Sequence, residues 1–339
     1  MNQRYSRQEL FSPIGKDGQQ QISDKHVLII GAGALGTSSS EALVRAGIGK
    51  LTIVDRDYVE WSNLQRQQLY TEEDAKSRIP KAIAAQKRLS SVNSTVEIQA
   101  IIADASAREL EEWAKNVDLI IDATDNFETR MIINDISQKM GVPWIYGACV
   151  GSYGITCTFI PEKTPCLSCL LETVPIGGLT CNTAGIISPA VQMVVAYQIS
   201  EALKILVGDF GSIRNKLISF DLWKNQYSTI QVDKLKREDC PSCGNNRSYP
   251  YLLFENQTKT AVLCGRDSVQ IRPSFLTVRD LPALEKLLAK KRGTIQRNPY
   301  LLSYTADPYR LVFFKDGRVL VHGTKDISEA KALYNQYLG

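Results

Sequence analysis

Four cysteines of the chain stand in two matched pairs, Cys166-x-x-Cys169 and Cys240-x-x-Cys243. Two thiolates separated by two residues can occupy two corners of a tetrahedral metal site, and a second pair completes it. Because the chain has only two histidines, an all-cysteine site is the simplest arrangement. Two unrelated reduced pairs are the alternative interpretation. A closed four-sulfur site leaves no open coordination position, so the pattern predicts a structural zinc ion without a catalytic role.

A glycine-rich turn is the second feature with chemical potential. It contains Gly31, Gly33, Ala34 and Gly36. The apolar run 26–30 precedes this turn, a helical segment over 37–46 follows it, and a second apolar run ends on Asp55. This order is typical of a βαβ unit that binds a nucleotide: the glycines allow a tight turn and close approach of a phosphate. A helix that begins there offers unpaired N–H groups to an anion.

A set of polar residues follows the ends of the predicted strands. It comprises Asp55, Asn63, Arg66, Lys81, Asp125 and Asn126. Two cations and two acids around a glycine turn suit a triphosphate with Mg²⁺ better than a dinucleotide. Arg66 and Lys81 would neutralise phosphate oxygens, and Asp125 would hold the metal. The alternatives are a solvated surface for the two cations and an ordinary turn for Asp125.

These residues need a scaffold that brings strand ends together. Strand and helix patterns alternate to about residue 150, which predicts an α/β fold: a doubly wound, Rossmann-like, mostly parallel sheet with helices on both faces. We expect a nucleotide-binding domain over 1–248 and a small, basic α+β module over 249–339. The module contains a hairpin over 309–321, turned by Asp316-Gly317. The loop over 161–187 is long enough to indicate a function.

The N-terminal arm, residues 1–25, is polar and allows two interpretations. It is either a frayed tail or a docked helix, and the helical spacing of Leu10, Phe11 and Ile14 favours the helix. We therefore expect these three apolar side chains to pack against the domain.

Charge and hydropathy limit the cellular context. The net charge is +4, and residues 249–339 hold 14 Lys and Arg against 8 Asp and Glu. This basic tail would fit an acidic partner or nucleic acid, but a solvated surface is the simpler interpretation. No apolar stretch is long enough for a membrane span, and paired reduced cysteines fit a cytoplasmic protein.

The motifs occur in one order that resembles the MoeB/ThiF adenylyltransferases (HesA/MoeB/ThiF), bacterial relatives of ubiquitin-activating enzymes. The resemblance covers about residues 4–247, so it implies that the domain over 1–248 is an ATP-binding adenylation domain. Its motifs are Arg4-Tyr-Ser-Arg7, the glycine turn, Asp55, Ser62-Asn-Leu-Gln-Arg-Gln67, Pro80-Lys81, Asp122-Ala-Thr-Asp-Asn126 and the two cysteine pairs. The resemblance implies a homodimer that binds Mg-ATP and a small sulfur-carrier protein ending in Gly-Gly. The carrier carboxylate would attack the α-phosphorus and release pyrophosphate, in molybdopterin or thiamine-thiazole biosynthesis.

The resemblance also implies roles for single residues. Asp55 would bind ribose, and Asn63, Arg66 and Lys81 the phosphates. Ser62 and Asn126 belong to the same nucleotide-binding set, Asp125 would hold magnesium, and Arg7 would reach the partner subunit's site. Two departures stand out: Ala34 replaces a glycine common in the turn, and Ala75-Lys-Ser-Arg-Ile79 replaces the usual acidic, glycine-rich approach to Lys81.

Cys181 bears on the pathway. In ThiF-like enzymes a cysteine at this position can link covalently to the carrier, whereas in MoeB-like enzymes it is not needed for adenylation. We favour the second, because nothing around the thiol except Thr180 and Asn182 is placed to lower its pKa. An incidental thiol on the loop is the alternative interpretation.

Other functions stay open at this point. An NAD-dependent oxidoreductase fits the glycine turn but not Arg66, Lys81 and Asp125. A relative that activates a tRNA base would fit the basic tail, and an inactive carrier-docking protein would not need the intact polar set.

Overall fold

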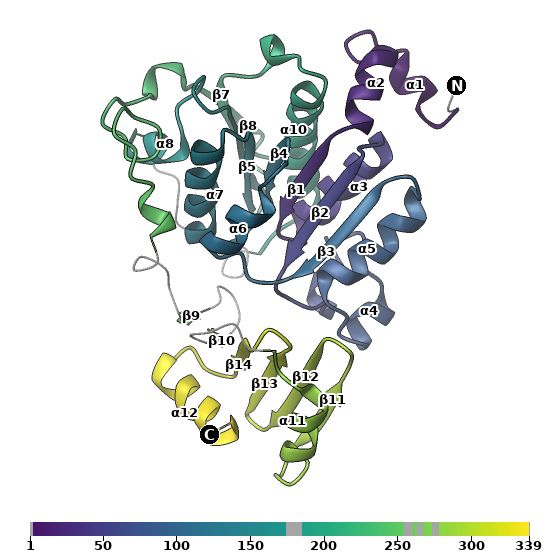
Figure 1. Ribbon diagram of the computed structural model, residues 1–339, viewed down its shortest axis with the longest axis vertical. Coiled ribbons are helices and arrows are strands. Elements are labelled where there is room, and N and C mark those ends of the chain that lie inside the picture. The colour runs from purple at the N-terminus through teal and green to yellow at the C-terminus, as the bar shows by residue number, and fades with distance from the viewer. Residues whose placement is uncertain (1–2, 174–184, 254–259, 263–266, 273–277, 339) are drawn as a thin grey trace. The chain divides into compact units, whose positions relative to one another are not determined.

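The computed structural model describes residues 3–173, 185–253, 260–262, 267–272 and 278–338 (Figure 1). The chain forms two compact units. The first comprises residues 1–76 and 80–256, and the second comprises 77–79 and 257–339.

The first unit is built on one sheet, which has eight strands over the described residues. They are β1 (His26–Ile30), β2 (Lys50–Asp55), β3 (Glu97–Ile102), β4 (Leu119–Asp122), β5 (Trp144–Val150), β6 (Tyr153–Phe159), β7 (Lys216–Asp221) and β8 (Gln226–Gln231). The strand order is β3-β2-β1-β4-β5-β6-β7-β8. Pairing is parallel from β3 through β5 and antiparallel from β5 through β8. The sheet is therefore mixed, which corrects the expectation of a mostly parallel sheet.

The antiparallel pairing of β5 with β6 follows from the short connection between them. Gly151, with φ of 60°, turns the chain back directly into β6. A parallel neighbour would need a crossover of a dozen or more residues. The sequence alone shows alternating strands there but not their direction.

Helices cover both faces of this sheet. On one face α3 (Ala34–Ala46) contacts α5 (Lys81–Val92) and α10 (Ser188–Leu206). On the other, α7 (Phe127–Met140) contacts α6 (Ala107–Trp113) and α8 (Leu167–Thr173), and Figure 1 shows α6 and α7 in front of the strands. The short α4 (Glu72–Lys76) precedes α5.

Helix α3 begins earlier than the expected start at residue 37: it starts at Ala34, with Gly33 as its N-cap. Helix α7 starts at Phe127. The Asn126 side chain accepts a hydrogen bond from the Glu128 amide at 2.9 Å, so it satisfies an N–H of the first turn.

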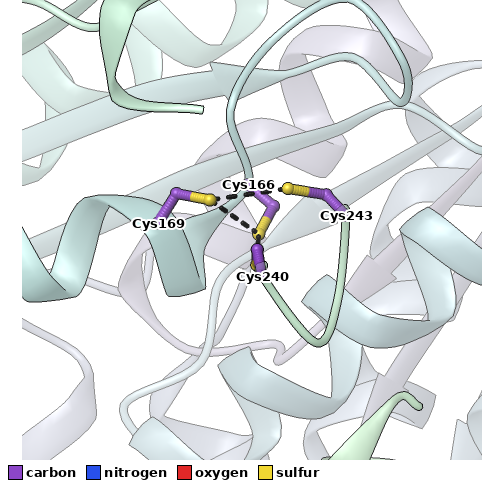
Figure 2. Close-up of side chains that lie close together, drawn as sticks. All are labelled: Cys166, Cys169, Cys240 and Cys243. Atoms are coloured by element: carbon purple, nitrogen blue, oxygen red, sulfur yellow. Dashed lines mark hydrogen bonds between the residues drawn. The ribbon is translucent and has the colours of Figure 1, made fainter. Parts of the chain in front are cut away.

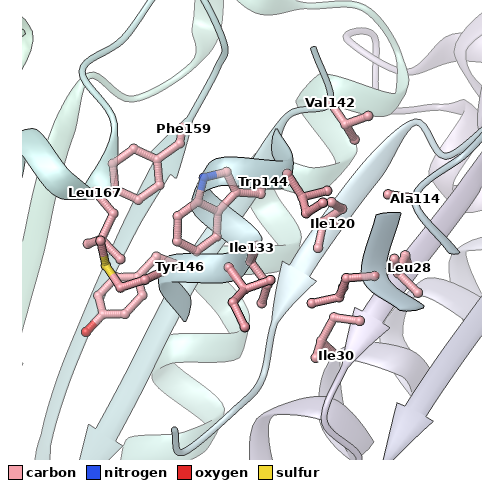
Figure 3. Packing of buried hydrophobic residues seen from close by; sticks show 14 of the residues in the cluster. Leu28, Ile30, Ala114, Ile120, Ile133, Val142, Trp144, Tyr146, Phe159 and Leu167 are labelled. Carbon is pink, nitrogen blue, oxygen red and sulfur yellow. The ribbon is translucent and has the colours of Figure 1, made fainter. Parts of the chain in front are cut away.

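Buried apolar side chains form a core between α7 and the sheet. Trp144 and Phe159, on neighbouring strands, stack with ring centroids 4.7 Å apart (Figure 3). Leu28 from β1 and Ile133 from α7 are fully buried in the same cluster. Burying a large apolar side chain contributes about 1.5–3 kcal/mol.

The N-terminal arm is helical, with α1 (Ser6–Glu9) and α2 (Gly15–Ser23). The expected packing of Leu10 and Phe11 is wrong, because they lie between the two helices and are 73% and 60% exposed. Tyr5 and Ile22 are buried instead. The Tyr5 hydroxyl accepts a hydrogen bond from Asn93 Nδ2 at 2.8 Å.

The second unit is an antiparallel sheet, six-stranded over the described residues, in the order β11-β12-β13-β14-β10-β9. Its strands are β9 (Thr260–Val262), β10 (Ser268–Ile271), β11 (Thr294–Arg297), β12 (Leu301–Ala306), β13 (Tyr309–Phe314) and β14 (Val319–His322), with helices α11 (Leu281–Leu288) and α12 (Ile327–Leu338). The β13–β14 hairpin and its turn at Gly317, with φ of 89°, are confirmed. Strands β11 and β12 were not predicted.

No helix within the described ranges is both long enough and apolar enough to span a membrane.

Candidate nucleotide site and cysteine cluster

The carboxyl ends of three parallel strands meet at one edge of the first unit's sheet. Ile30, the last residue of β1, pairs with Val54 on one side and Asp122 on the other. The glycine turn therefore lies between the ends of β2 and β4, at the edge where open α/β sheets bind ligands.

The three glycines of the turn have different reasons to lack a side chain. Gly31 has φ of 100°, and a Cβ there would lie 2.5 Å from the Ala123 carbonyl oxygen. A Cβ on Gly36 would lie 1.9 Å from the Gly31 carbonyl oxygen. A Cβ on Gly33 would meet no protein atom within 4 Å. Gly31 and Gly36 are therefore required by the protein itself, whereas open space lies next to Gly33.

Asp55 organises this turn. Its Oδ2 accepts a hydrogen bond from the Ala32 amide at 2.6 Å, and its Oδ1 accepts one from the Asp57 amide at 2.7 Å. The Tyr70 hydroxyl donates to the Ala32 carbonyl at 2.6 Å. Burial raises the pKa of Asp55, and the negative charge of Asp57 adds to this, while Lys81 opposes it. A carboxylate has about four lone-pair sites, so acceptor capacity remains for a ribose hydroxyl.

Lys81 brings a buried positive charge to the same edge. It is the first residue of α5, and only 5% of it is exposed. Its Nζ lies 3.6 Å from Asp57 Oδ2, and its amide donates to the Asp57 carbonyl at 2.9 Å. A buried ammonium beside a glycine turn is suited to a phosphate, because burial weakens solvent screening.

Arg56 and Asp104 form an ion pair at 3.2 Å that was not anticipated from the sequence. Burial alone would lower the pKa of Arg56, but Asp104, Asp57 and Asp125 together raise it. Asp125, which is exposed, therefore acts on the same electrostatic cluster as Asp57. A run of charged residues directly after an apolar strand was the available sequence signal.

The segment around Asn63 folds on itself. Asn63 is 4% exposed, and its Oδ1 accepts from the Glu60 amide at 3.0 Å. Arg66 Nη1 donates to the Ser62 carbonyl at 2.8 Å. Among the described residues, no hydrogen bond or ion pair joins Arg66 to Lys81 or Asp125.

Arg7 lies at the wrong end of α3 to join this cluster within its own chain. Its neighbour Gln8 donates to the carbonyl of Ala46, the last residue of α3, at 3.0 Å. Gly33 caps the other end of this helix, which has 13 residues and spans about 20 Å at 1.5 Å per residue.

A second buried ion pair, at the carboxyl end of β4, was also not anticipated from the sequence. Arg130 Nε donates to Asp122 Oδ2 at 3.1 Å, and the side chains are 14% and 0% exposed. The signal in the sequence was Asp122 itself, a carboxylate at the end of an apolar strand, because a buried charge needs a partner.

The four paired cysteines converge in the first unit, as Figure 2 shows. Cys166 directly precedes α8, Cys169 lies in α8, and the second pair lies in the loop after 239. All four are buried, and their sulfur atoms lie within 4.8 Å of one another. The shortest Sγ–Sγ distances are 3.5 Å for Cys169 and Cys243 and 3.6 Å for Cys166 and Cys240. A disulfide needs about 2.0 Å, whereas sulfurs 2.3 Å from a tetrahedral zinc stand about 3.8 Å apart. The donor set and its spacing fit zinc. Cys181 lies outside the described residues.

Comparison with known proteins identifies related chains. The ThiF family matches residues 5–242. The sulfur carrier protein ThiS adenylyltransferase of Bacillus subtilis (strain 168) is 54% identical over 339 residues and covers 100% of both chains. The Escherichia coli K12 protein of the same name is 35% identical, covering 73% of this chain and 97% of its own. The E. coli K12 molybdopterin-synthase adenylyltransferase is 33% identical, covering 71% and 96%.

Solved structures show the same fold. A crystal structure of E. coli MccB superposes with a TM-score of 0.62, at 21% identity, and covers 72% of this chain and 74% of that one. At this identity the likeness concerns the fold only. Together, the family match over 5–242 and the full-length relative at 54% identity establish that the chain belongs to the ThiF family.

Proposed function

We propose that this chain adenylates the C-terminal glycine of a small ubiquitin-fold sulfur-carrier protein of the ThiS type, with ATP as the second substrate and pyrophosphate as a product. The observation that carries the proposal is the full-length similarity to the B. subtilis ThiS adenylyltransferase, which includes the residues beyond 242. The glycine turn with Asp55 and Lys81 supplies a site of suitable chemistry.

The reaction needs alignment and charge stabilisation rather than a base. A carboxylate oxygen of the carrier forms a bond to the α-phosphorus, and the bond from that phosphorus to the bridging oxygen of pyrophosphate breaks. The carboxylate is already ionised at neutral pH, so no side chain has to remove a proton. Lys81, buried beside the turn, would stabilise charge on the phosphates, with Arg66 as a second cation.

The exposed carboxylate of Asp125 is an oxygen donor of the kind that Mg²⁺ prefers, and its negative charge acts on the cluster around Arg56. When bound, the metal would neutralise phosphate charge. Asn63, Ser62 and Asn126 are proposed to complete the nucleotide-binding set around it.

We propose that Cys166, Cys169, Cys240 and Cys243 hold one zinc ion with a structural role. Because each cysteine is at most 3% exposed, no position faces substrate. Zinc thiolates need a reducing environment, which supports a cytoplasmic location.

A homodimer would explain Arg7. In one chain, α3 separates the Arg7 arm from the glycine turn by about 20 Å. The exposed Leu10 and Phe11 of the same arm would be buried in a subunit interface. Arg7 would then supply a cation to the partner subunit's site.

The decisive experiment compares carriers. The purified protein is incubated with ATP, Mg²⁺ and either a ThiS-like or a MoaD-like carrier, and pyrophosphate exchange is followed. We expect exchange with the ThiS-like carrier at least tenfold faster. Faster exchange with the MoaD-like carrier would assign the chain to molybdopterin biosynthesis, and NAD binding without exchange would support an oxidoreductase.

The same mixtures test Cys181. Exchange should survive Cys181→Ala, since adenylation needs no thiol. Mass spectrometry of the wild type shows whether a covalent carrier adduct forms. An adduct lost in Cys181→Ala would overturn the expectation from the sequence that this thiol is unused.

We further propose that residues 1–248 carry the adenylation activity and that 249–339 form a separate module. Its charge of 14 Lys and Arg against 8 Asp and Glu fits a solvated surface.

A further inference from the structure

Asp122 is an unusual residue to find at the end of a buried strand. It is fully buried, and it follows three apolar residues of β4. Removing a carboxylate from water is costly unless hydrogen bonds and an opposite charge compensate it. Apolar side chains of similar volume would stabilise this position as well. The charge therefore calls for a reason beyond stability.

Its partner Arg130 joins three parts of the fold. The guanidinium donates from Nε to Asp122 and from Nη2 to the Thr124 carbonyl, at 2.6 Å. It also lies over the ring of Tyr146 on β5, with 5.2 Å to the centroid, and reaches the Gly147 carbonyl at 3.5 Å. One side chain of α7 thus connects the β4 turn to β5.

The same pair immobilises Thr124 from both ends of its backbone. The Thr124 amide and hydroxyl donate to Asp122 Oδ1 at 2.9 Å and 2.7 Å. Its carbonyl is held by Arg130. That carbonyl lies in the planar peptide group that leads into Asp125, so fixing the oxygen also fixes where the Asp125 backbone begins.

On the other side of Asp125, the Asn126 side chain caps α7. Asp125 is therefore an exposed carboxylate whose two neighbours both have fixed backbones. Preorganisation of this kind favours a side chain that binds a metal or phosphate, because a small displacement of such a group strongly lowers the reaction rate.

We propose that Arg130, held by Asp122, is a positioning residue that orients Asp125 toward the metal and phosphates. The inference deepens the proposed function, on which its activity readout rests. Arg130 itself would contact neither substrate nor metal. It acts through the Thr124–Asp125 peptide.

Arg130→Lys tests this in the full-length protein, because lysine keeps the charge but cannot donate to Asp122 and Thr124 with the fork geometry of arginine. The first readout is binding of Mn²⁺, a probe for the magnesium site, in the presence of ATP, followed by electron paramagnetic resonance. We expect the dissociation constant to rise at least tenfold. Pyrophosphate exchange should lose at least tenfold in kcat.

Ile133→Val is the matched control. Ile133 is fully buried on the same helix, so its shortening destabilises α7 without touching the turn. It should lower the melting temperature and leave Mn²⁺ binding within twofold of wild type. If Arg130→Lys behaves like this control, Arg130 is merely structural and the proposal is overturned.

Two further variants test the positioning role of Arg130. In an Asp125→Ala background, Arg130→Lys should add little further loss of Mn²⁺ binding, and independent losses would contradict positioning through Asp125.

If Arg130→Lys does not fold, Thr124→Val removes the hydroxyl donor to Asp122 and should raise the Mn²⁺ dissociation constant at least threefold. An unchanged constant would overturn the proposal. Absence of exchange in the wild type would instead refute the proposed function, while Mn²⁺ binding still decides the role of Arg130.

Discussion

Replacing Gly33 by alanine separates nucleotide binding from folding. An added Cβ at Gly33 meets no protein atom within 4 Å, and the residue already has extended backbone angles, with φ of −79° and ψ of −150°. The protein should lose only the difference between glycine and alanine at an N-cap, which is below about 1 kcal/mol. For a domain of this size such a loss lowers Tm by less than about 4 °C.

The same methyl group occupies the space into which a phosphate must move if the turn binds ATP. We therefore expect the dissociation constant for a non-hydrolysable ATP analogue, measured by titration calorimetry, to rise at least tenfold, which corresponds to about 1.4 kcal/mol. Pyrophosphate exchange at subsaturating ATP should fall in proportion.

Gly36→Ala is the matched comparison. Its Cβ would have to move from 1.9 Å to beyond 3.0 Å from the Gly31 carbonyl oxygen, so α3 and the turn must separate. Such overpacking costs about 1–3 kcal/mol or more, and Tm should fall by more than in Gly33→Ala. Wild-type ATP affinity in a folded Gly33→Ala protein would refute the assignment of this turn to phosphate.

Three further predictions concern other parts of the site. Asp125→Ala should leave Tm unchanged, because the side chain is exposed, and reduce pyrophosphate exchange at least ~100-fold; near-normal exchange would remove Asp125 from the metal site. The wild type should contain one zinc per chain by elemental analysis, and Cys240→Ser should lose the metal and melt at a lower temperature; a stable, active protein without metal would contradict the zinc site. Mixing inactive Arg7→Ala and Asp125→Ala subunits should restore part of the exchange through hybrid dimers, and no recovery despite proven subunit exchange would place Arg7 outside the partner's site.

The residues of the glycine turn and the cysteine pairs could be identified from the sequence because their chemistry depends on short spacings along the chain. A tight turn needs glycine at Gly31 whatever surrounds it, and a Cys-x-x-Cys pair can present both sulfurs to one ion. The β13–β14 hairpin followed from Asp316-Gly317 for the same reason. The parallel half of the first sheet could also be predicted, since a helix connects each of its strands to the next along the chain.

The rest was decided by contacts between segments far apart in the sequence. The antiparallel direction of β7 depends on where the chain returns to the sheet after α10, and apolar alternation carries no such information. The ion pairs of Arg56 with Asp104 and of Lys81 with Asp57 join residues 48 and 24 positions apart. Arg7 matched a motif, but only the packing of Gln8 against the end of α3 shows that it lies far from the turn of its own chain. The sequence determined which groups the protein has for its chemistry, and tertiary structure decided which of them meet, because proximity depends on the packing of the whole sheet.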